Sequence, residues 1–356
     1  MFDDIFNIEP FCLDREQKMA FLLKHQLHLT TFHYQHCKEY RKIINILRLD
    51  LNRIKSIEHI PFIPVRLFKE YVLSSIDKEK QYKILTSSGT SSQVVSKIVL
   101  DRQSSLNQQK LLSKIVSNFI GDTRMPMIII DSKKVITNRA LFSARGAGIL
   151  GFSIFGTDKI YALDDDMNIN INEIKNFLDK HRNEKILLFG FTFIIWQYFY
   201  QNLLKHNYDI DLSNANLIHG GGWKKLITQA VSKKEFNNCL RNVCGLRHIY
   251  DYYGMVEQIG SIFMECEYGN LHTSIFSDII VRKAKDWSLC DFGEKGIIQL
   301  LSLLPTSYPG HSILSEDCGV ILGEDDCLCK RKGKYFSILG RIQNAEIRGC
   351  GDTYEN

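Results

Sequence analysis

The sequence predicts an α/β fold, with layered and largely parallel sheets flanked by helices, and three observations predict it. Short apolar runs indicate buried strands at residues 127–130, 149–154, 186–189 and 216–218. Stretches of helical character alternate with these runs, at residues 104–119, 170–180, 192–205 and 224–236. From about Ile275 onward, short apolar runs between Gly- and Asp-rich turns indicate a smaller β-rich subdomain, with strands at 297–304 and 319–322.

The bulk composition fits a large compact protein. The chain has 356 residues, of which 44% are hydrophobic, so it is long enough to bury a sizeable core. Helical character also runs from Asp14 to about Leu47. Pro and Gly mark no flexible linker. We therefore expect one large domain over residues 1–340, followed by a short tail at 341–356.

Charge and cysteine usage narrow the class of protein. The formal net charge is +5, which does not predict nucleic-acid binding but would help to attract an anionic substrate. The acidic N-terminus lacks the pattern of a signal peptide, and the apolar stretch from Ile186 to Trp196 is too short to span a bilayer. We therefore expect a cytoplasmic protein. Its ten cysteines are then expected to be core residues, metal ligands or nucleophiles rather than disulfides.

A first candidate site is a run of small hydroxyl residues around a glycine. Backbone N–H groups and hydroxyls are the donors that phosphate oxygens need. The run lacks the Gly-Lys-Ser/Thr of a Walker A loop, and taken alone it is more typical of a polar surface loop. Its candidate phosphate-binding residues are Ser87, Ser88, Gly89, Thr90 and Ser91.

Three further segments have the composition of a nucleotide site. Tyr252 and Tyr253 stand beside Gly254 and can present a ring to a purine, and Glu257 can hold Mg²⁺ near phosphates. The alternative is a strand end with buried tyrosines. A second segment holds three glycines that let a flat ligand approach the backbone, unless they only form a tight turn. The third can bind ribose and phosphate through an acidic residue and a downstream arginine. These last two segments contribute Gly221, Gly222, Asp317 and Arg341.

Two spaced pairs suggest a metal site. Cys266 and His272 form one pair, and Cys327 and Cys329 form the other. Three sulfurs and one imidazole suit tetrahedral Zn²⁺. The alternative is four unrelated residues in turns, with the second pair exposed on opposite faces of a strand.

In this order along the chain, the nucleotide segments resemble the core motifs of the adenylate-forming superfamily of acyl-CoA synthetases. The resemblance narrows to the LuxE-like acyl-protein synthetases of the fatty-acid reductase complex of bacterial bioluminescence. The stretches that carry it are Pro64-Val65-Arg66-x-Phe68-Lys69, Gly220-Gly221-Gly222-Trp223-Lys224, Tyr253-Gly254-Met255-Val256-Glu257 and Glu346-x-Arg348-Gly349-Cys350. Related aryl-CoA ligases carry a similar Cys…His…Cys-x-Cys arrangement, which favours the zinc interpretation.

The resemblance implies an ATP- and Mg²⁺-dependent long-chain-fatty-acid–protein ligase. Such an enzyme would form an acyl adenylate, with Glu257 as a catalytic residue, and transfer the acyl group to its own Cys350 as a thioester. It also implies a reductase partner that converts the acyl group to an aldehyde. Two departures from the superfamily stand out: Val256 replaces the threonine of the motif, and we expect the full C-terminal domain of the superfamily to be lacking.

Two other functions stay open on the sequence. One is an acyl- or aryl-CoA ligase that releases a soluble thioester. The other is a nucleotide-binding scaffold without catalysis, which Val256 and the missing C-terminal domain would favour.

Overall fold

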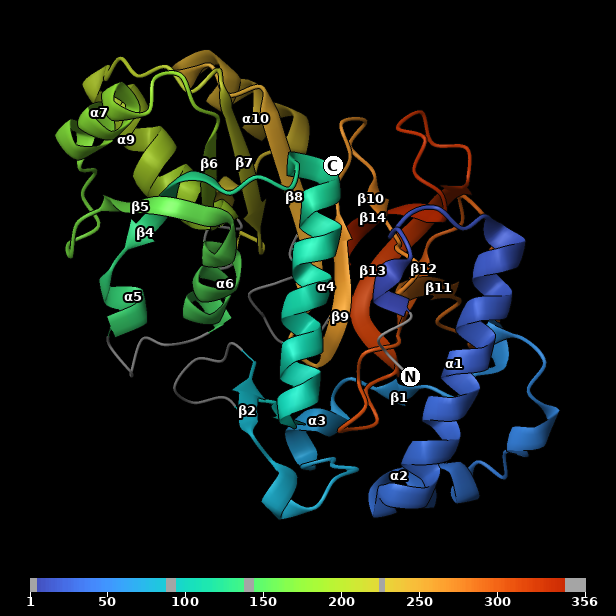
Figure 1. Ribbon diagram of the computed structural model, residues 1–356. Coiled ribbons are helices and arrows are strands. Elements are labelled where there is room, and N and C mark those ends of the chain that lie inside the picture. The colour runs from blue at the N-terminus through green and yellow to red at the C-terminus, as the bar shows by residue number, and fades with distance from the viewer. Residues whose placement is uncertain (1–4, 88–93, 138–143, 224–227, 343–356) are drawn as a thin grey trace. The chain divides into compact units, whose positions relative to one another are not determined.

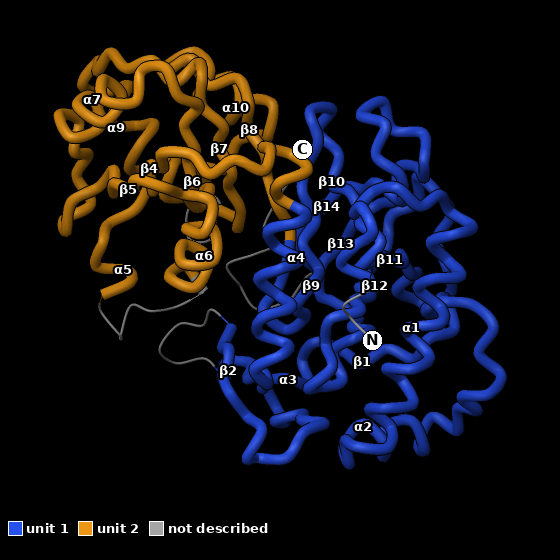
Figure 2. Tube along the Cα trace, in the orientation of Figure 1, with its two compact units in different colours: residues 1–115, 254–345 blue, residues 116–253, 346–356 orange. Residues whose placement is uncertain are grey.

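The structure is a computed structural model that describes residues 5–87, 94–137, 144–223 and 228–342 (Figure 1). The chain divides into two compact units (Figure 2). Unit 1 comprises residues 1–115 and 254–345, and unit 2 comprises residues 116–253 and 346–356. The separate tail expected at 341–356 lies almost entirely outside the described residues and stays a prediction.

The N-terminal helical region of unit 1 is two helices rather than one. Helix α1 (Arg15–His36) begins at a capping box, in which the Asp14 side chain accepts a hydrogen bond from the Gln17 amide at 3.0 Å. It ends at Cys37, whose backbone is extended, and α2 (Lys38–Ile46) follows directly. The prediction of helix from residue 14 to 47 is therefore right in type but misses the break at Cys37.

The main sheet of unit 1 is mostly antiparallel. Its order is β10 (Leu271–His272), β14 (Lys334–Arg341), β13 (Ser312–Glu324), β12 (Gly296–Ser302) and β11 (Ser277–Arg282), with β1 (Ile63–Pro64) parallel to β13. Strand β9 (Gln258–Met264) packs against β12. A separate hairpin pairs β2 (Lys83–Thr86) with β3 (Lys97–Leu100). The β-rich character expected beyond Ile275 is thus confirmed.

Short helical segments complete unit 1. They are η1 (Ile5–Asn7), η2 (Leu51–Arg53), η3 (Ile57–His59), α3 (Leu67–Glu70) and η4 (Lys78–Lys80). The long helix α4 (Arg102–Ile120) begins in unit 1 and ends in unit 2.

Unit 1 buries a cluster of charges between α1 and the main sheet. Lys18 on α1 is 2% exposed and reaches Asp278 at 3.3 Å and the Thr273 hydroxyl at 2.7 Å. Lys334 donates to the other oxygen of Asp278 at 2.8 Å. Burial lowers the pKa of Lys18, whereas the two lysines outweigh the burial of Asp278 and lower the pKa of its carboxyl. This pairing fixes α1 to β11 and β14.

Unit 2 is built on parallel strands in the order β5 (Gly156–Leu163), β4 (Met125–Ser132), β6 (Ile186–Phe191), β7 (Ala215–Gly220) and β8 (His248–Met255). Every residue of β4, β6 and β7 is buried, which is typical of a parallel sheet covered on both faces. The helical elements are α5 (Lys134–Thr137), α6 (Ala144–Phe152), η5 (Ser153–Phe155), α7 (Ile171–Lys180), α8 (Thr192–Ile194), η6 (Ile195–Tyr200), α9 (Gln201–His206) and α10 (Lys233–Cys244).

Two sequence predictions in unit 2 differ from the structure in the described residues. The apolar run at 149–154 is not a strand: Ile149 and Phe152 lie on helix α6, and the neighbouring strand is β5. A short apolar run fits a buried helix as well as a buried strand. Of the helix expected at 224–236, residues 224–227 lie outside the described part of the chain, and α10 begins at Lys233, where the Ser232 hydroxyl caps it by accepting from the Glu235 amide.

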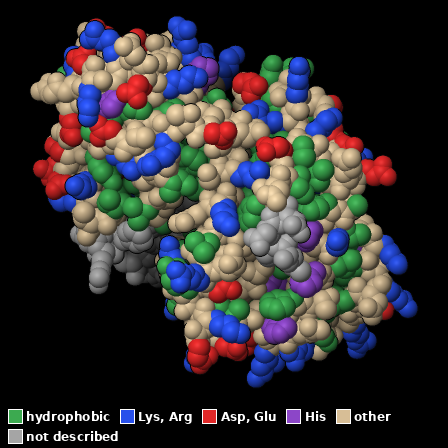
Figure 3. Space-filling model, viewed as in Figure 1, with side chains coloured by type: hydrophobic (Ala, Val, Ile, Leu, Met, Phe, Trp, Pro, Cys, Tyr) green, Lys and Arg blue, Asp and Glu red, His purple; other side chains and the backbone are tan. Residues whose placement is uncertain are grey.

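The surface carries charged side chains of both signs. On the face in Figure 3, basic and acidic side chains are interspersed over both units. Within the described part of the chain, no helix combines the length and apolarity needed to cross a membrane.

Candidate nucleotide and metal sites

The base of the hydroxyl-rich loop is tied to the predicted magnesium ligand. Ser87 follows the last residue of β2, and Ser96 precedes the first residue of β3. The Ser87 amide donates to the Ser96 carbonyl at 3.2 Å, and the Ser96 amide donates to the Ser87 hydroxyl at 3.0 Å. The Ser96 hydroxyl in turn donates to Oε1 of Glu257 at 2.7 Å. Two segments separated by 161 residues are thereby joined within unit 1.

Glu257 is positioned by the tight turn between β8 and β9. It is 3% exposed and lies three residues after Gly254, the glycine of the Tyr-Gly-x-x-Glu segment. A Cβ at residue 254 would lie 2.8 Å from the carbonyl oxygen of Ser261, so only glycine fits this close approach of backbones. The turn therefore presents a buried carboxylate at the base of the hydroxyl-rich loop.

Asp317 and Arg341 are cross-strand partners. They are paired in register on β13 and β14, and Nε of Arg341 lies 3.3 Å from Oδ1 of Asp317. The Asp317 side chain is 3% exposed and the Arg341 side chain 11% exposed. The sequence placed these residues in one site, and the structure brings them into contact.

In unit 2, the glycine segment begins where β7 ends. A Cβ at Gly220 would overlap the ring of Tyr252 on the neighbouring strand β8, so that ring lies against bare backbone. The Tyr252 ring also packs on Phe152 at a centroid distance of 5.0 Å. Gly221 has φ of 76°, a left-handed conformation that favours glycine, and Gly222 is buried. Tyr252 thus has a packing role in the sheet, while its role toward a nucleotide stays a prediction.

The carboxyl ends of the strands in unit 2 hold a polar group that the sequence did not single out. His219 on β7 contacts the Thr192 hydroxyl at 3.0 Å and Oδ1 of Asp251 at 3.8 Å. Burial lowers the pKa of His219 to about 3, so the imidazole is neutral at physiological pH. In open α/β sheets, ligands bind at the carboxyl ends of the strands. Gly221 and Gly222 follow β7 at this edge of the sheet. The sequence assigned no role to His219, which stands between the apolar run at 216–218 and the glycine segment.

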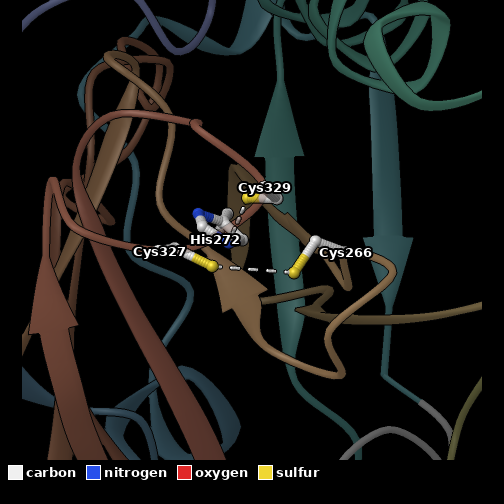
Figure 4. Close-up of side chains that lie close together, drawn as sticks. All are labelled: Cys266, His272, Cys327 and Cys329. Atoms are coloured by element: carbon white, nitrogen blue, oxygen red, sulfur yellow. Dashed lines mark hydrogen bonds between the residues drawn. The ribbon is translucent and has the colours of Figure 1, made fainter.

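The two spaced pairs meet at one corner of unit 1 (Figure 4). Cys266 lies in the turn between β9 and β10, and His272 lies on β10. Cys327 and Cys329 lie in the turn between β13 and β14, and β10 pairs with β14. The alternative of four unrelated residues is therefore wrong, as is the placement of the second pair on a strand.

The four side chains converge closely enough to share one ion. Their ligand atoms all lie within 4.8 Å of one another, with the sulfurs of Cys266 and Cys327 at 3.9 Å and the Cys329 sulfur 3.2 Å from Nε2 of His272. Two thiolates that each lie about 2.3 Å from one Zn²⁺ would be about 3.8 Å apart. Asn270, which the sequence did not indicate, donates to the Cys327 sulfur at 3.5 Å.

The electrostatics of this corner differ between its members. Burial raises the pKa of Cys266 to about 12. Burial, followed by the charges of Arg331 and Lys18, lowers the pKa of His272 to about 4, so this imidazole is neutral. A neutral imidazole is the form that binds a metal, whereas a buried thiol becomes a thiolate when an ion is present to neutralise it.

Several predicted residues lie outside the described part of the chain. They are Ser88, Gly89, Thr90, Ser91 and Cys350. Ser87, Gly254, Glu257, Asp317 and Arg341 belong to unit 1, whereas Gly221, Gly222, Tyr252 and Tyr253 belong to unit 2. Tyr253 and Gly254 are consecutive in β8, and the boundary between the units falls between them. The common nucleotide site of all these residues stays a prediction.

Comparison with known proteins decides the family. The sequence matches the family "Acyl-protein synthetase, LuxE" over residues 1–356. The chain belongs to this family. The resemblance inferred from the four stretches of sequence is confirmed.

Two similar proteins carry the same name. The long-chain-fatty-acid–luciferin-component ligase of Aliivibrio fischeri is 25% identical over 343 residues, which cover 91% of this chain and 85% of the relative. The ligase of that name from Vibrio harveyi is 23% identical over 337 residues, covering 90% and 83% of the two chains.

Solved structures establish the fold independently. A 2-hydroxyisobutyryl-CoA ligase in complex with 2-HIB-AMP matches with a TM-score of 0.73 and 14% identity, over 94% of this chain and 70% of the ligase. An open conformation of that ligase, in complex with 2-HIB-AMP and CoA, matches with the same TM-score at 13% identity and covers 77% of the ligase chain. The predicted adenylate-forming architecture is thereby confirmed.

Proposed function

We propose that this acyl-protein synthetase uses ATP and Mg²⁺ to activate a long-chain fatty acid and then transfers the acyl group to its own Cys350. The full-length family match, together with relatives named as long-chain-fatty-acid ligases, supports this most directly. Within the structure, the tie between Glu257 and the base of the hydroxyl-rich loop supports a phosphate-binding site in unit 1.

In the first step, a carboxylate oxygen of the fatty acid attacks the α-phosphorus of ATP and pyrophosphate leaves. Enzymes promote such steps by positioning and by neutralising charge. Donors at Ser87–Ser91 would contact the phosphates. Glu257 would hold the magnesium ion, whose charge offsets that of the departing pyrophosphate. Asp317 would accept from the ribose hydroxyls, with Arg341 beside it.

In the second step, the Cys350 thiolate attacks the acyl carbon of the mixed anhydride and AMP leaves. The product is a protein thioester and AMP. We propose a cytoplasmic setting, in which thiols stay reduced, and a reductase partner that accepts the acyl group from the thioester.

The test is intact mass spectrometry of the protein after incubation with ATP, Mg²⁺ and fatty acids of different chain length. We expect a mass increase of one acyl group that Cys350→Ser abolishes, while Cys12→Ser, at an exposed cysteine of unit 1, keeps it. Pyrophosphate release that depends on the fatty acid should persist in Cys350→Ser. Acyl label found only on added CoA would favour an acyl-CoA ligase, and no fatty-acid-dependent pyrophosphate release would favour a scaffold.

We further propose that Cys266, His272, Cys327 and Cys329 hold a structural Zn²⁺. All four positions are filled by protein ligands, which is typical of structural rather than catalytic zinc sites. The two segments that carry the ligands lie far apart in sequence, so a shared ion would hold them together in unit 1.

Metal analysis of protein purified without chelator tests the zinc proposal. We expect one zinc per chain, and about none in Cys327→Ser, with a lowered midpoint of thermal unfolding. Cys290→Ser, at a half-buried cysteine away from the cluster, should keep both the zinc and the midpoint. A metal content near zero in wild-type protein that remains fully folded would contradict the proposal.

A further inference from the structure

One surface of unit 1 combines exposed apolar side chains with a concentration of positive charge. At the end of α2 and in the residues that follow, Ile46 is 78% exposed, Leu47 53% and Leu49 43%. Three bulky apolar side chains exposed within four residues are unusual on a solvated surface, where such residues normally occur singly.

The same segment carries most of the net charge of the protein. Residues 38–55, here called the basic surface, contain six basic residues and two acidic ones. They therefore supply four of the five net positive charges of the whole chain. Figure 3 shows Lys and Arg side chains along the edge of unit 1 that carries α2 in Figure 1.

The protein holds this surface in a fixed position. Tyr40 and Ile44, on the inner face of α2, are each 1% exposed. The Tyr34 hydroxyl on α1 donates to the Asn45 side chain at 2.9 Å, and Nε of Arg41 donates to the Tyr34 carbonyl at 2.8 Å. Because the inner face is fully used, Ile46, Leu47 and Leu49 are left pointing away from the core.

We propose that the basic surface docks the enzyme on the surface of an anionic phospholipid membrane. Exposed Ile and Leu side chains enter the boundary between headgroups and acyl chains, while lysines and arginines around them pair with anionic headgroups. Charge complementarity identifies the partner as anionic. A lipid surface is favoured because long-chain fatty acids partition into membranes, a choice that rests on the proposed substrate.

Co-sedimentation with phospholipid vesicles tests the proposal without ATP or fatty acid. We expect wild-type protein to bind phosphatidylglycerol-containing vesicles and to bind pure phosphatidylcholine vesicles far more weakly, with affinity falling as salt rises. Ile46→Ser/Leu47→Ser/Leu49→Ser should weaken binding at least about tenfold. Lys42→Gln/Arg48→Gln/Lys55→Gln should weaken it on the order of 100-fold, about fivefold per cation.

A control variant removes three exposed leucines elsewhere on the protein. Leu204, Leu289 and Leu322 are 55%, 48% and 42% exposed, and their triple serine variant should bind vesicles like wild type. Equal binding to anionic and zwitterionic vesicles, no binding to either, or unchanged binding by both surface variants would overturn the proposal.

Pyrophosphate release with a fatty acid supplied in detergent micelles separates the two proposals. Surface variants that lose vesicle binding should keep this activity. If wild-type protein released no pyrophosphate, this would count against the proposed function alone, since vesicle binding is measured without substrates.

Discussion

Unit 1 surrounds charged and thiol side chains with antiparallel strands, whereas unit 2 surrounds aromatic rings with parallel strands. In unit 1, Lys18, Asp278 and Lys334 are buried together. In unit 2, the rings of Phe152, Phe189 and Tyr252 pack against one another at the carboxyl half of the sheet. The first cluster depends on the pairing of charges and the second on the fit of shapes, so the two clusters should respond to different substitutions.

The charge cluster predicts the largest effect. Asp278→Asn removes the carboxylate that contacts both buried ammonium groups. We expect the free energy of unfolding to fall by about 3–5 kcal/mol, the cost of leaving a buried charge without its partner. Urea unfolding followed by circular dichroism measures it. Lys18→Met should relieve part of the loss when it is combined with Asp278→Asn, and additive effects would contradict the pairing.

The aromatic interior should be sensitive to added volume instead. Gly220→Ala places a methyl group inside the Tyr252 ring, so we expect a loss of about 1–3 kcal/mol in the free energy of unfolding. Tyr252→Leu makes room, and the double variant should lose less than the sum of the two single ones. A double-mutant cycle by thermal unfolding checks this, and independence of the two sites would argue against the contact.

Two histidines should give opposite pH dependences. In unit 1, burial lowers the pKa of His33 to about 3, below its value of about 6.5 in the unfolded chain. The unfolded chain then takes up the proton first, so stability falls as pH drops from about 6.5 toward 3. His33→Gln should flatten this part of the stability curve, measured by urea unfolding from pH 7 to pH 4.

In unit 2, His181 lies 2.7 Å from Glu184 and 3.1 Å from Asp158. The hydrogen bond to Glu184, outweighing burial and helped by Asp158, raises the pKa of His181. The stability that protonated His181 contributes to the folded state is present below about pH 6.5 and is lost as pH rises through the folded-state pKa of His181. His181→Gln should therefore cost more stability at pH 5.5 than at pH 8.5, and a pH-independent cost would refute the ion pair.

Removing an exposed ion pair should change the free energy of unfolding least. Arg182 and Asp179 in unit 2 lie 2.9 Å apart with side chains 77% and 69% exposed. Asp179→Asn should change the free energy of unfolding by less than about 1 kcal/mol. A loss as large as that of Asp278→Asn would mean that burial does not govern the cost of removing a carboxylate here.

The sequence predicted best where spacing alone defines the chemistry. The Cys-x-Cys and Cys-x5-His pairs pointed to one metal site, and the four side chains do converge. Strands β4, β6 and β7 were also found, because continuous apolar runs are typical of buried parallel strands. The run at 149–154 has the same composition but lies on α6, so composition without period could not separate helix from strand.

Residues that act through tertiary contact were not predictable. Ser96 is one serine among many in the sequence, and only the return of the chain at Glu257 gives its hydroxyl a partner. The break between α1 and α2 at Cys37 is similar: no Pro or Gly marks it, and the pairing of Tyr34 with Asn45 and of Arg41 with the end of α1 becomes visible only in three dimensions.

The turn that carries Cys327 and Cys329 closes the hairpin of β13 and β14, and the far end of that hairpin carries Asp317 opposite Arg341. A slip of one residue in an antiparallel pair turns every side chain to the opposite face. A Zn²⁺ ion that joins this turn to Cys266 and His272 would fix the pairing register of the whole hairpin. Loss of that cross-link, by oxidation of the cysteines or removal of the ion, would then free the hairpin to shift, and Asp317 would no longer face Arg341.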